Sequence, residues 1–414
     1  MPRTALVYTP RFSEYDLGPS HPLKPTRVLR TFELVQACGL LKGRSVFVSD
    51  PAAADEETIA RVHSTEYIEA VRAASEAGTL RRPQTYGLGT IDNPIVKGMY
   101  DAAALIAGAS VTAAELVIDG KAKAAFNPGG GLHHAHRQRA SGFCVFNDAA
   151  IAIAHLLKRC GEGVKVAYID IDAHHGDGVQ EAFYDRREVL TISVHESGRY
   201  LFPMTGAVSE IGEGEGEGFS VNLPLSPYTG DDVYVWAFRQ VVIPLLEAYE
   251  PDFVCTQLGV DTHYQDPLTH LCCTTRGYMT VVEEIAKRAP RWIAIGGGGY
   301  DVTVVPRAWT LAFARMAGKE APKQIPEPEA QHYRRNDQPV PLHDLGGPKV
   351  DEDWLRVTRE FAEESVREVK ARIFPYHGLA TESGEQRTPQ EFTGDEKPTE
   401  SRGASDADER GKRR

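Results

Sequence analysis

Five polar residues that can bind a metal or transfer a proton crowd into the stretch YIDIDAHHGDGVQ, residues 168 to 180, directly after an apolar run. The five are Asp170, Asp172, His174, His175 and Asp177. Side chains alternate between faces along a strand, so Asp170, Asp172 and His174 are expected to project the same way. Two carboxylates and an imidazole that converge in a buried place repel each other or lose hydration unless a cation lies among them. The stretch therefore predicts a divalent metal site.

A further carboxylate, Asp261, ends a second apolar run, DFVCTQLGVD, residues 252 to 261. Together with Asp172 and His174 it would form an Asp/His/Asp set with an open coordination position, as in catalytic zinc sites. The Asp-x-His spacing alone is weak evidence, because polar residues at a strand end also form structural ion pairs or are simply solvated. Such a set accepts Zn²⁺ or Fe²⁺, and the sequence leaves both open.

Two adjacent histidines, His133 and His134, follow a glycine-rich turn in GGGLHHAH, residues 129 to 136. Imidazoles donate and accept protons near neutral pH, so the pair indicates acid–base chemistry. Histidine pairs also occur as metal ligands or as surface features, and these alternatives stay open. Asp170 and Asp177 favour the acid–base interpretation, because spare carboxylates can hold the second ring nitrogens.

A second glycine-rich segment, GGGGY at residues 296 to 300, lacks the spacing of a dinucleotide-binding loop. Its glycines are interpreted as room for Tyr300 to reach the site, where a phenol could donate a hydrogen bond to a developing oxyanion. The glycines of residues 211 to 225 lead into a strand-like run and are interpreted as a flexible surface turn. His136 is given no role in the site.

Four segments share one layout, in which an apolar run of strand length ends at a polar cluster. They are residues 121 to 136, 164 to 177, 252 to 261 and 291 to 300. Near-continuous apolarity is typical of parallel strands covered on both faces. Helix-like stretches lie between them, at 147 to 160, capped by Asn147 or Asp148, and at 233 to 250, with a kink at Pro244. This alternation predicts an α/β fold, with one site assembled from four loops beyond the carboxyl ends of the strands.

The end of the chain differs in composition from the rest. Residues 319 to 350 are rich in Pro and charge and predict a loop on the surface, whereas 351 to 374 predict a helix docked on the core. The docking stripe is predicted to comprise Trp354, Val357, Phe361, Val366, Val369 and Ile373. The segment 380 to 414 holds a single aromatic residue, Phe392, amid charge, and is expected to be disordered.

Overall composition limits the classes of function. The chain has 414 residues, 42% hydrophobic and 25% charged, and a formal net charge of -12. This charge argues against nucleic-acid binding and is compatible with a basic protein or peptide partner. We expect no run of membrane-span length and no secretory signal. The six cysteines show no CxxC pair, which favours reduced thiols in a cytoplasmic protein.

The ordered motifs resemble the zinc-dependent histone deacetylase family of the arginase/deacetylase superfamily, and within it the bacterial acetoin utilization deacetylases. The resemblance spans about residues 1 to 375 and implies one catalytic domain with the arginase-like fold, an α/β three-layer sandwich with a central, mostly parallel sheet. The motifs are HPLKPTRV (21 to 28), GLGTIDNP (87 to 94), GGGLHHAHRQRASGFCVFNDAA (129 to 150), YIDIDAHHGDGVQEAF (168 to 183), LFPMTG (201 to 206), LGVDTHYQDPL (258 to 268) and GGGGY.

The resemblance also implies roles for the matching catalytic positions. The metal ligands would be Asp172, His174 and Asp261. His134, steadied by Asp177, would be the general base and then the acid. His133, paired with Asp170, would give electrostatic support or share proton transfer, and Tyr300 would polarise the amide carbonyl.

Substrate positions follow from the same resemblance. They would be Asp92 at the rim and Gly142, Phe143, Phe202 and Leu268 along a narrow tunnel. Arg27 would lie near the channel by which acetate leaves. A structural K⁺ ion would be held by Asp170, His174, Ser193 and nearby carbonyls.

The implied reaction is hydrolysis of the acetyl amide of N6-acetyl-lysine in proteins, with acetyl-CoA synthetase as an implied substrate; oligomeric state is left open. Deacetylation of an acetylpolyamine or another small amide is an alternative, and a non-catalytic acyl-lysine binder is another. Two-metal ureohydrolases are disfavoured, because they need carboxylates where this chain has Gly176 and Gly259.

Overall fold

An eight-stranded sheet forms the centre of the protein in a computed structural model, which describes residues 3–334 and 338–381. The strands are β1 (Thr4–Val7), β2 (Val46–Ser49), β3 (Ala124–Asn127), β4 (Val166–Asp170), β5 (Val189–Glu196), β6 (Ser220–Leu225), β7 (Phe253–Gln257) and β8 (Trp292–Ile295). Their order is β2-β1-β3-β8-β7-β4-β5-β6, and every neighbouring pair is parallel. The predicted α/β fold is confirmed. The segment 380 to 414, expected to be disordered, lies outside the described residues except for Ala380 and Thr381.

The four polar clusters meet because their strands are neighbours. Strands β3, β8, β7 and β4 lie side by side, and all of their residues are buried. Coverage on both faces explains why each strand is an almost continuous apolar run. Parallel strands end at the same edge of the sheet, so the loops after these four strands converge, as the sequence predicted.

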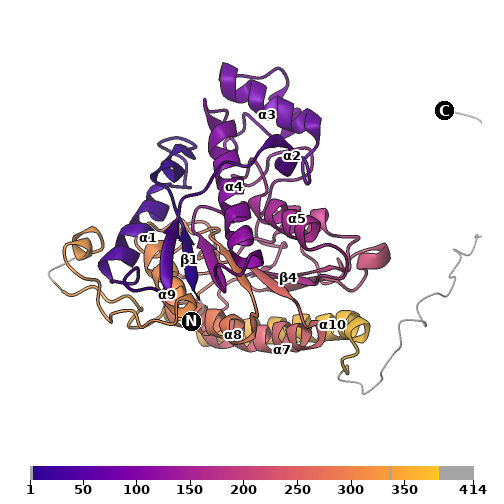
Figure 1. Ribbon diagram of the computed structural model, residues 1–414. Helices are drawn as coiled ribbons and strands as arrows, with labels where there is room; N and C mark the ends of the chain where they lie inside the picture. Colours follow the sequence, from indigo (N-terminus) through magenta and orange to yellow (C-terminus); the bar gives the residue numbers. More distant parts are fainter. Residues whose placement is uncertain (1–2, 335–337, 382–414) are drawn as a thin grey trace, which may run out of the picture.

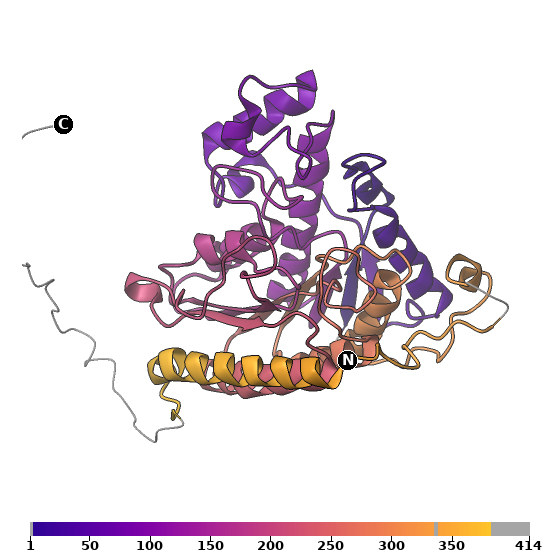
Figure 2. The same cartoon turned by 180° about the vertical axis from the view of Figure 1, so that it is seen from behind.

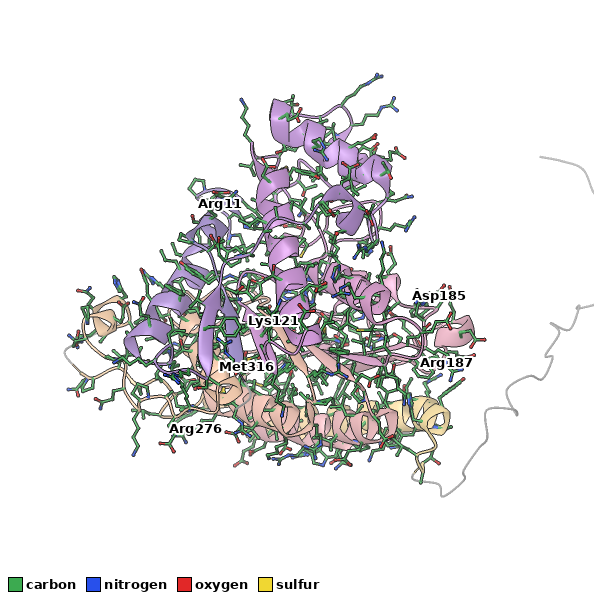
Figure 3. The ribbon with its side chains drawn as sticks, viewed as in Figure 1. Arg11, Lys121, Asp185, Arg187, Arg276 and Met316 are labelled. Atoms are coloured by element: carbon green, nitrogen blue, oxygen red, sulfur yellow. The ribbon has the colours of Figure 1, made fainter. Side chains whose placement is uncertain are left out.

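Helices cover both faces of this sheet and complete the three layers (Figures 1 and 2). The helices are α1 (Thr26–Ala37), α2 (Glu56–Ile59), α3 (Thr65–Ala77), α4 (Met99–Ile118), α5 (Asp148–Cys160), α6 (Asp177–Ala182), α7 (Asp231–Tyr249), α8 (Thr275–Arg288), α9 (Val305–Met316) and α10 (Glu352–Ile373). Short 3-10 turns span Pro10–Glu14, Pro83–Tyr86, Gly214–Gly216, Glu329–His332 and Phe374–His377. One face carries α4 and α5, and the other carries α7, α8 and α10 (Figure 1). Charged side chains such as Arg11, Asp185 and Arg276 project at the periphery (Figure 3).

Helix α4 corrects one expectation from the sequence. By length and composition alone it could cross a membrane, although no such run was expected. Most of its apolar window, 67%, is buried inside the protein, where it packs against α5 and β3. Its apolarity is therefore accounted for by its place in the core of the fold.

Helix α10 occupies the segment predicted to dock, but its packed face differs from the predicted stripe. The buried residues are Thr358, Ala362, Ser365, Val366, Val369 and Ile373, and they face β6 and α7. Trp354 and Val357 are exposed by 43% and 37%, so their place in the stripe was wrong. Helical spacing alone put them on this face, and it does not tell which neighbours each turn of the helix meets. Trp354 instead packs on Tyr228, with ring centroids 4.6 Å apart.

A buried histidine, His63, ties the loop of the histidine pair to helix α5. Its Nδ1 donates to the carbonyl of His136 at 2.9 Å, and its Nε2 accepts from the Asn147 backbone N–H at 2.9 Å. The Asn147 side chain in turn caps α5 and donates to the carbonyls of His133 and Ala135. Burial lowers the pKa of His63 to about 4, so the folded protein holds this residue neutral.

Stability should therefore fall with acid in a way that depends on His63. Unfolded histidine titrates near pH 6.5, above the folded value, so the stabilisation is complete above that pH and is lost as the pH falls toward 4. Between pH 7.5 and 5 the free energy of unfolding should drop by about 2 kcal/mol more in the wild type than in His63→Gln. Urea unfolding at both pH values measures this, with exposed His332→Gln as the matched control. Equal drops in wild type and His63→Gln would contradict the expectation.

Candidate functional site

Three side chains from two loops converge at the carboxyl edge of the sheet. Asp172 and His174 follow β4, and Asp261 follows β7; all three are buried. The His174 Nδ1 atom lies 3.1 Å from Asp172 Oδ1 and 3.0 Å from Asp261 Oδ2. Ligand atoms of a tetrahedral zinc ion, each roughly 2.0–2.2 Å from the metal, lie roughly 3.4 Å apart. The spacing and the chemistry of these donors therefore fit a divalent ion.

Backbone closes tightly around these three side chains. The Gly298 N–H and the Gln257 Nε2 donate to Asp172 Oδ2 at 2.7 and 2.5 Å. A Cβ at Gly298 would lie 2.0 Å from Asp261 Oδ2, and one at Gly259 would lie 2.3 Å from Asp172 Oδ2. Only glycine fits at either position. The same crowding leaves no space for an additional carboxylate at Gly259, as a two-metal hydrolase would need.

The charges of the triad are unbalanced without a cation. Burial raises the pKa of Asp261 well above its usual range, and the neighbouring Asp172 raises it further. Burial acts the same way on Asp172, but His133 and His174 outweigh it and hold the pKa of that carboxyl well below its usual range. A bound divalent ion would let both carboxylates ionise.

The two histidines of GGGLHHAH lie beside the triad, each held by a carboxylate. His133 Nδ1 donates to Asp170 Oδ2 at 2.7 Å, and His134 Nδ1 donates to Asp177 Oδ1 at 2.7 Å. The Nε2 atoms of the two rings are 3.0 Å apart. The structure thus brings together the two histidine–carboxylate pairs that the sequence predicted.

The two histidines differ in charge. Burial lowers the pKa of His134 to about 4, and the charge of His133 adds to this effect. Burial acts the same way on His133, but Asp170 and Asp172 outweigh it and raise the pKa to about 9. At neutral pH His133 is therefore protonated and donates from Nε2 to the unprotonated Nε2 of the neutral His134.

Tyr300 closes another side of the site. The centroid of its ring lies 6.5 Å from that of the His174 ring, and the two rings are nearly perpendicular. The backbone N–H of Tyr300 donates to Asp266 Oδ2 at 2.8 Å. Burial, with the charge of Asp261, raises the pKa of the phenol well above its usual value, so the hydroxyl stays a donor.

Arg27 holds the glycine segment that precedes Tyr300. It is buried, and its Nη1 donates to the carbonyls of Gly297 and Gly299 at 2.5 and 3.1 Å. The sequence did not predict this contact, which places Arg27 against the backbone of the glycine segment. Its role near an acetate channel stays a prediction.

Two phenylalanines flank the approach to the site. The Phe143 ring packs edge-on against Tyr300 at 5.7 Å, and the Phe202 ring packs against His134 at 5.0 Å. A Cβ at Gly142 would lie 2.4 Å from the His134 ring and 2.8 Å from Phe202. Glycine at 142 therefore lets the backbone approach the His134 ring closely. The roles of Gly142, Phe143 and Phe202 in lining a tunnel stay predictions.

The remaining predicted substrate residues lie farther out. Asp92 is exposed, and its carbonyl accepts from His21, whose ring packs on Phe143 at 4.4 Å. Leu268 is half-buried, and its N–H donates to Asp266 at 2.9 Å. These positions suit a rim, but no contact joins Asp92 or Leu268 to the triad, and their roles stay predictions.

Two other residues from the sequence are placed as follows. Ser193 on β5 lies opposite Asp170 on β4 in the register of the two strands. This placement is compatible with a shared cation site, and the K⁺ ion stays a prediction. His175, which had no assigned role, contacts Thr205 Oγ1 at 2.9 Å and Gln180 Oε1 at 3.2 Å. It therefore supports the loop that carries Phe202.

The sequence missed several supporting residues. Asp148, one of the two predicted helix caps, instead accepts from the Gly131 and Leu132 N–H groups at 3.0 and 2.7 Å and so shapes the glycine turn. The other predicted cap, Asn147, does cap the helix. Gln257 holds Asp172, and the only signal for it was an amide at the end of an apolar run. His136, which was given no role in the site, lies with its Nε2 3.3 Å from Asp177 Oδ2.

Comparison with known proteins agrees with this geometry. Residues 21–316 match the model of the histone deacetylase domain, which is more than half of the chain. The acetoin utilization protein AcuC of Bacillus subtilis (strain 168) is 43% identical over 335 residues, 78% of this chain and 84% of that protein. AcuC of Staphylococcus aureus (strain MRSA252) is 39% identical over 322 residues, 76% of this chain and 82% of that protein.

Two solved structures share the fold. An HDAC homolog from Aquifex aeolicus superposes with a TM-score of 0.77 at 28% identity, covering 88% of this chain and 100% of that one. An HDAC homolog complexed with SAHA gives 0.77 at 29% identity, covering 87% and 100%. The chain belongs to the histone deacetylase family of the arginase/deacetylase superfamily and is close to the acetoin utilization proteins.

Proposed function

We propose that this protein hydrolyses the acetyl amide of N6-acetyl-lysine in proteins and releases acetate. One observation carries the proposal: an Asp/His/Asp set lies beside a neutral, carboxylate-anchored His134 and the partly buried phenol of Tyr300. A ligand set, a base and a hydrogen-bond donor facing one point are what amide hydrolysis requires.

Asp172, His174 and Asp261 would hold the metal, which we propose is Zn²⁺, with Fe²⁺ as the alternative. When bound, such an ion supplies a Lewis acid that polarises the amide carbonyl and makes a water more acidic. Asp170 and Asp177 remain free of the metal, because each is engaged with a histidine at 2.7 Å.

The protein's own groups would then complete the reaction. His134 accepts a proton from the attacking water at Nε2, while its Nδ1 stays bonded to Asp177. The same nitrogen then delivers the proton to the departing amine. Tyr300 donates its hydroxyl to the carbonyl oxygen as negative charge develops there.

The approach to the site favours an acyl group on a long, apolar arm. The Phe143 and Phe202 rings suit the methylenes of a lysine side chain, which deliver the amide past His134 and Tyr300. An acetylpolyamine has a similar arm and is the second candidate. A binder without catalysis is disfavoured, because such a protein needs neither His134 nor Tyr300.

A substrate panel distinguishes these candidates. With zinc supplied, we expect acetate release from acetyl-lysine peptides and from acetylated acetyl-CoA synthetase, with kcat/KM at least about tenfold above that for acetylpolyamines. Preference for the polyamines would contradict the proposed substrate. Absence of turnover on any acetylated compound, with metal supplied, would support the binder instead.

Tyr300→Phe should bind substrate but turn it over slowly. Loss of one oxyanion donor typically costs about 10²–10³-fold in kcat. Steady-state kinetics measures this, with Tyr249→Phe as the control, since that buried hydroxyl bonds the Arg187 carbonyl at 3.1 Å, away from the site. Unchanged kcat in Tyr300→Phe, or an equal loss in both variants, would contradict the role of the phenol.

A further inference from the structure

The carboxylate that anchors the base is itself held from its other side. Asp177 Oδ1 accepts from His134 Nδ1 at 2.7 Å and from the Gly178 N–H at 3.0 Å. Asp177 Oδ2 faces His136 Nε2 at 3.3 Å. Both oxygens are therefore engaged by histidines of the same loop, which fixes the plane of the carboxylate.

His136 is in turn held by Glu181. The His136 Nδ1 donates to Glu181 Oε2 at 2.5 Å, and Glu181 Oε1 accepts from the Arg137 N–H at 3.3 Å. Helix α6 explains the match, because residues four apart lie on one face of a helix and present Asp177 and Glu181 together. The result is one chain of contacts from His134 through Asp177 and His136 to Glu181.

His136 carries a positive charge at neutral pH. Burial lowers its pKa, but Asp177 and Glu181 outweigh burial and raise it to about 9. Among the described residues, Arg139 also faces it, with Nη2 3.4 Å from Nε2, and His63 donates to its carbonyl. Because two carboxylates and one arginine surround the ring, the ring is protonated and can donate from both nitrogens.

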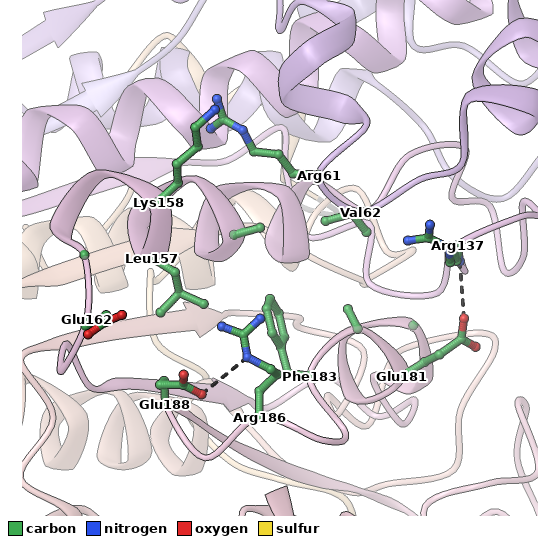
Figure 4. A pocket seen from close by; sticks show the side chains of 14 residues that line it. Arg61, Val62, Arg137, Leu157, Lys158, Glu162, Glu181, Phe183, Arg186 and Glu188 are labelled. Carbon is green, nitrogen blue, oxygen red and sulfur yellow. Dashed lines mark hydrogen bonds and ion pairs between the residues drawn. The ribbon is translucent and has the colours of Figure 1, made fainter. Parts of the chain in front are cut away.

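The outer end of this chain of contacts reaches water. Glu181 lines a pocket of about 670 Å³ between α5 and α6, together with Arg61, Arg137 and Lys158 (Figure 4). Its side chain is 50% exposed, whereas that of His136 is 11% exposed. The pair is therefore open to solvent on the Glu181 side, which weakens its Coulomb attraction.

We propose that His136 and Glu181 are positioning residues, which hold Asp177 in the orientation that anchors the ring of the catalytic His134. The proposal rests on the proposed deacetylase function. It assigns no contact with substrate to either residue. Partners of this indirect kind typically change activity by about 10–100-fold when removed.

His136→Ala tests the proposal through the split between kcat and KM on an acetyl-lysine peptide. We expect kcat to fall by about 10-fold or more, with KM changed less than about twofold. His136→Gln keeps a donor for Asp177 and should recover part of the loss. It also serves as the test should His136→Ala fail to fold.

His155→Ala is the matched control. His155 forms a similar half-buried pair with Glu115 on α5 and α4, and its side chain is 12% exposed, but neither residue contacts Asp177 or His134. Its kcat should stay within about twofold of wild type. An unchanged kcat in His136→Ala, or an equal loss in His155→Ala, overturns the proposal while wild-type activity leaves the proposed function standing.

A second readout does not need activity. The His136 ring should titrate near pH 9 by NMR in the wild type, and Glu181→Gln should move that titration toward about pH 6.5. An unmoved titration would show that Glu181 does not hold His136 and would overturn its part of the proposal. Wild-type inactivity on every acetylated substrate would instead contradict the proposed function and this role with it.

Discussion

The structure depends on the burial of four carboxylates at one edge of a parallel sheet. Asp170, Asp172, Asp177 and Asp261 are all buried or nearly so. An ionised carboxylate out of water is costly unless it is paired or hydrogen-bonded. Asp170 and Asp177 are each balanced by a histidine, but Asp172 and Asp261 face one another across His174. That residual imbalance makes the centre of the site a place for a cation.

The rest of the fold keeps these charges at short range. Gly259 and Gly298 let backbone pass where a Cβ would strike Asp172 or Asp261. Arg27 holds the same glycine segment from behind, and Asp148 holds the glycine turn before His133. The parallel sheet contributes by ending four strands at one edge, so that groups far apart in sequence meet without long loops.

The sequence predicted the residues of the site better than it predicted the residues that hold them in place. Apolar runs that end in polar clusters indicate both the strands and the edge of the sheet where those strands end. The sequence could therefore place Asp172, His174, Asp261 and the histidine pair at one site. The contacts of His136 with Asp177 and Glu181 were not predicted, because they depend on α6 presenting both carboxylates toward it, which the residues around His136 do not encode. The packed face of α10 was misjudged for a similar reason: helical spacing gives a stripe but not which neighbours each turn of the helix meets.

We propose that the buried triad of Asp172, His174 and Asp261 binds one divalent metal ion. The most direct measurement is the metal content of the purified full-length chain after dialysis against zinc, by plasma mass spectrometry. We predict one ion per chain in the wild type and in the exposed-residue control Asp232→Asn, and almost none in a folded Asp261→Asn variant. A wild type without bound metal, or an Asp261→Asn variant that retains a full equivalent, would contradict the account.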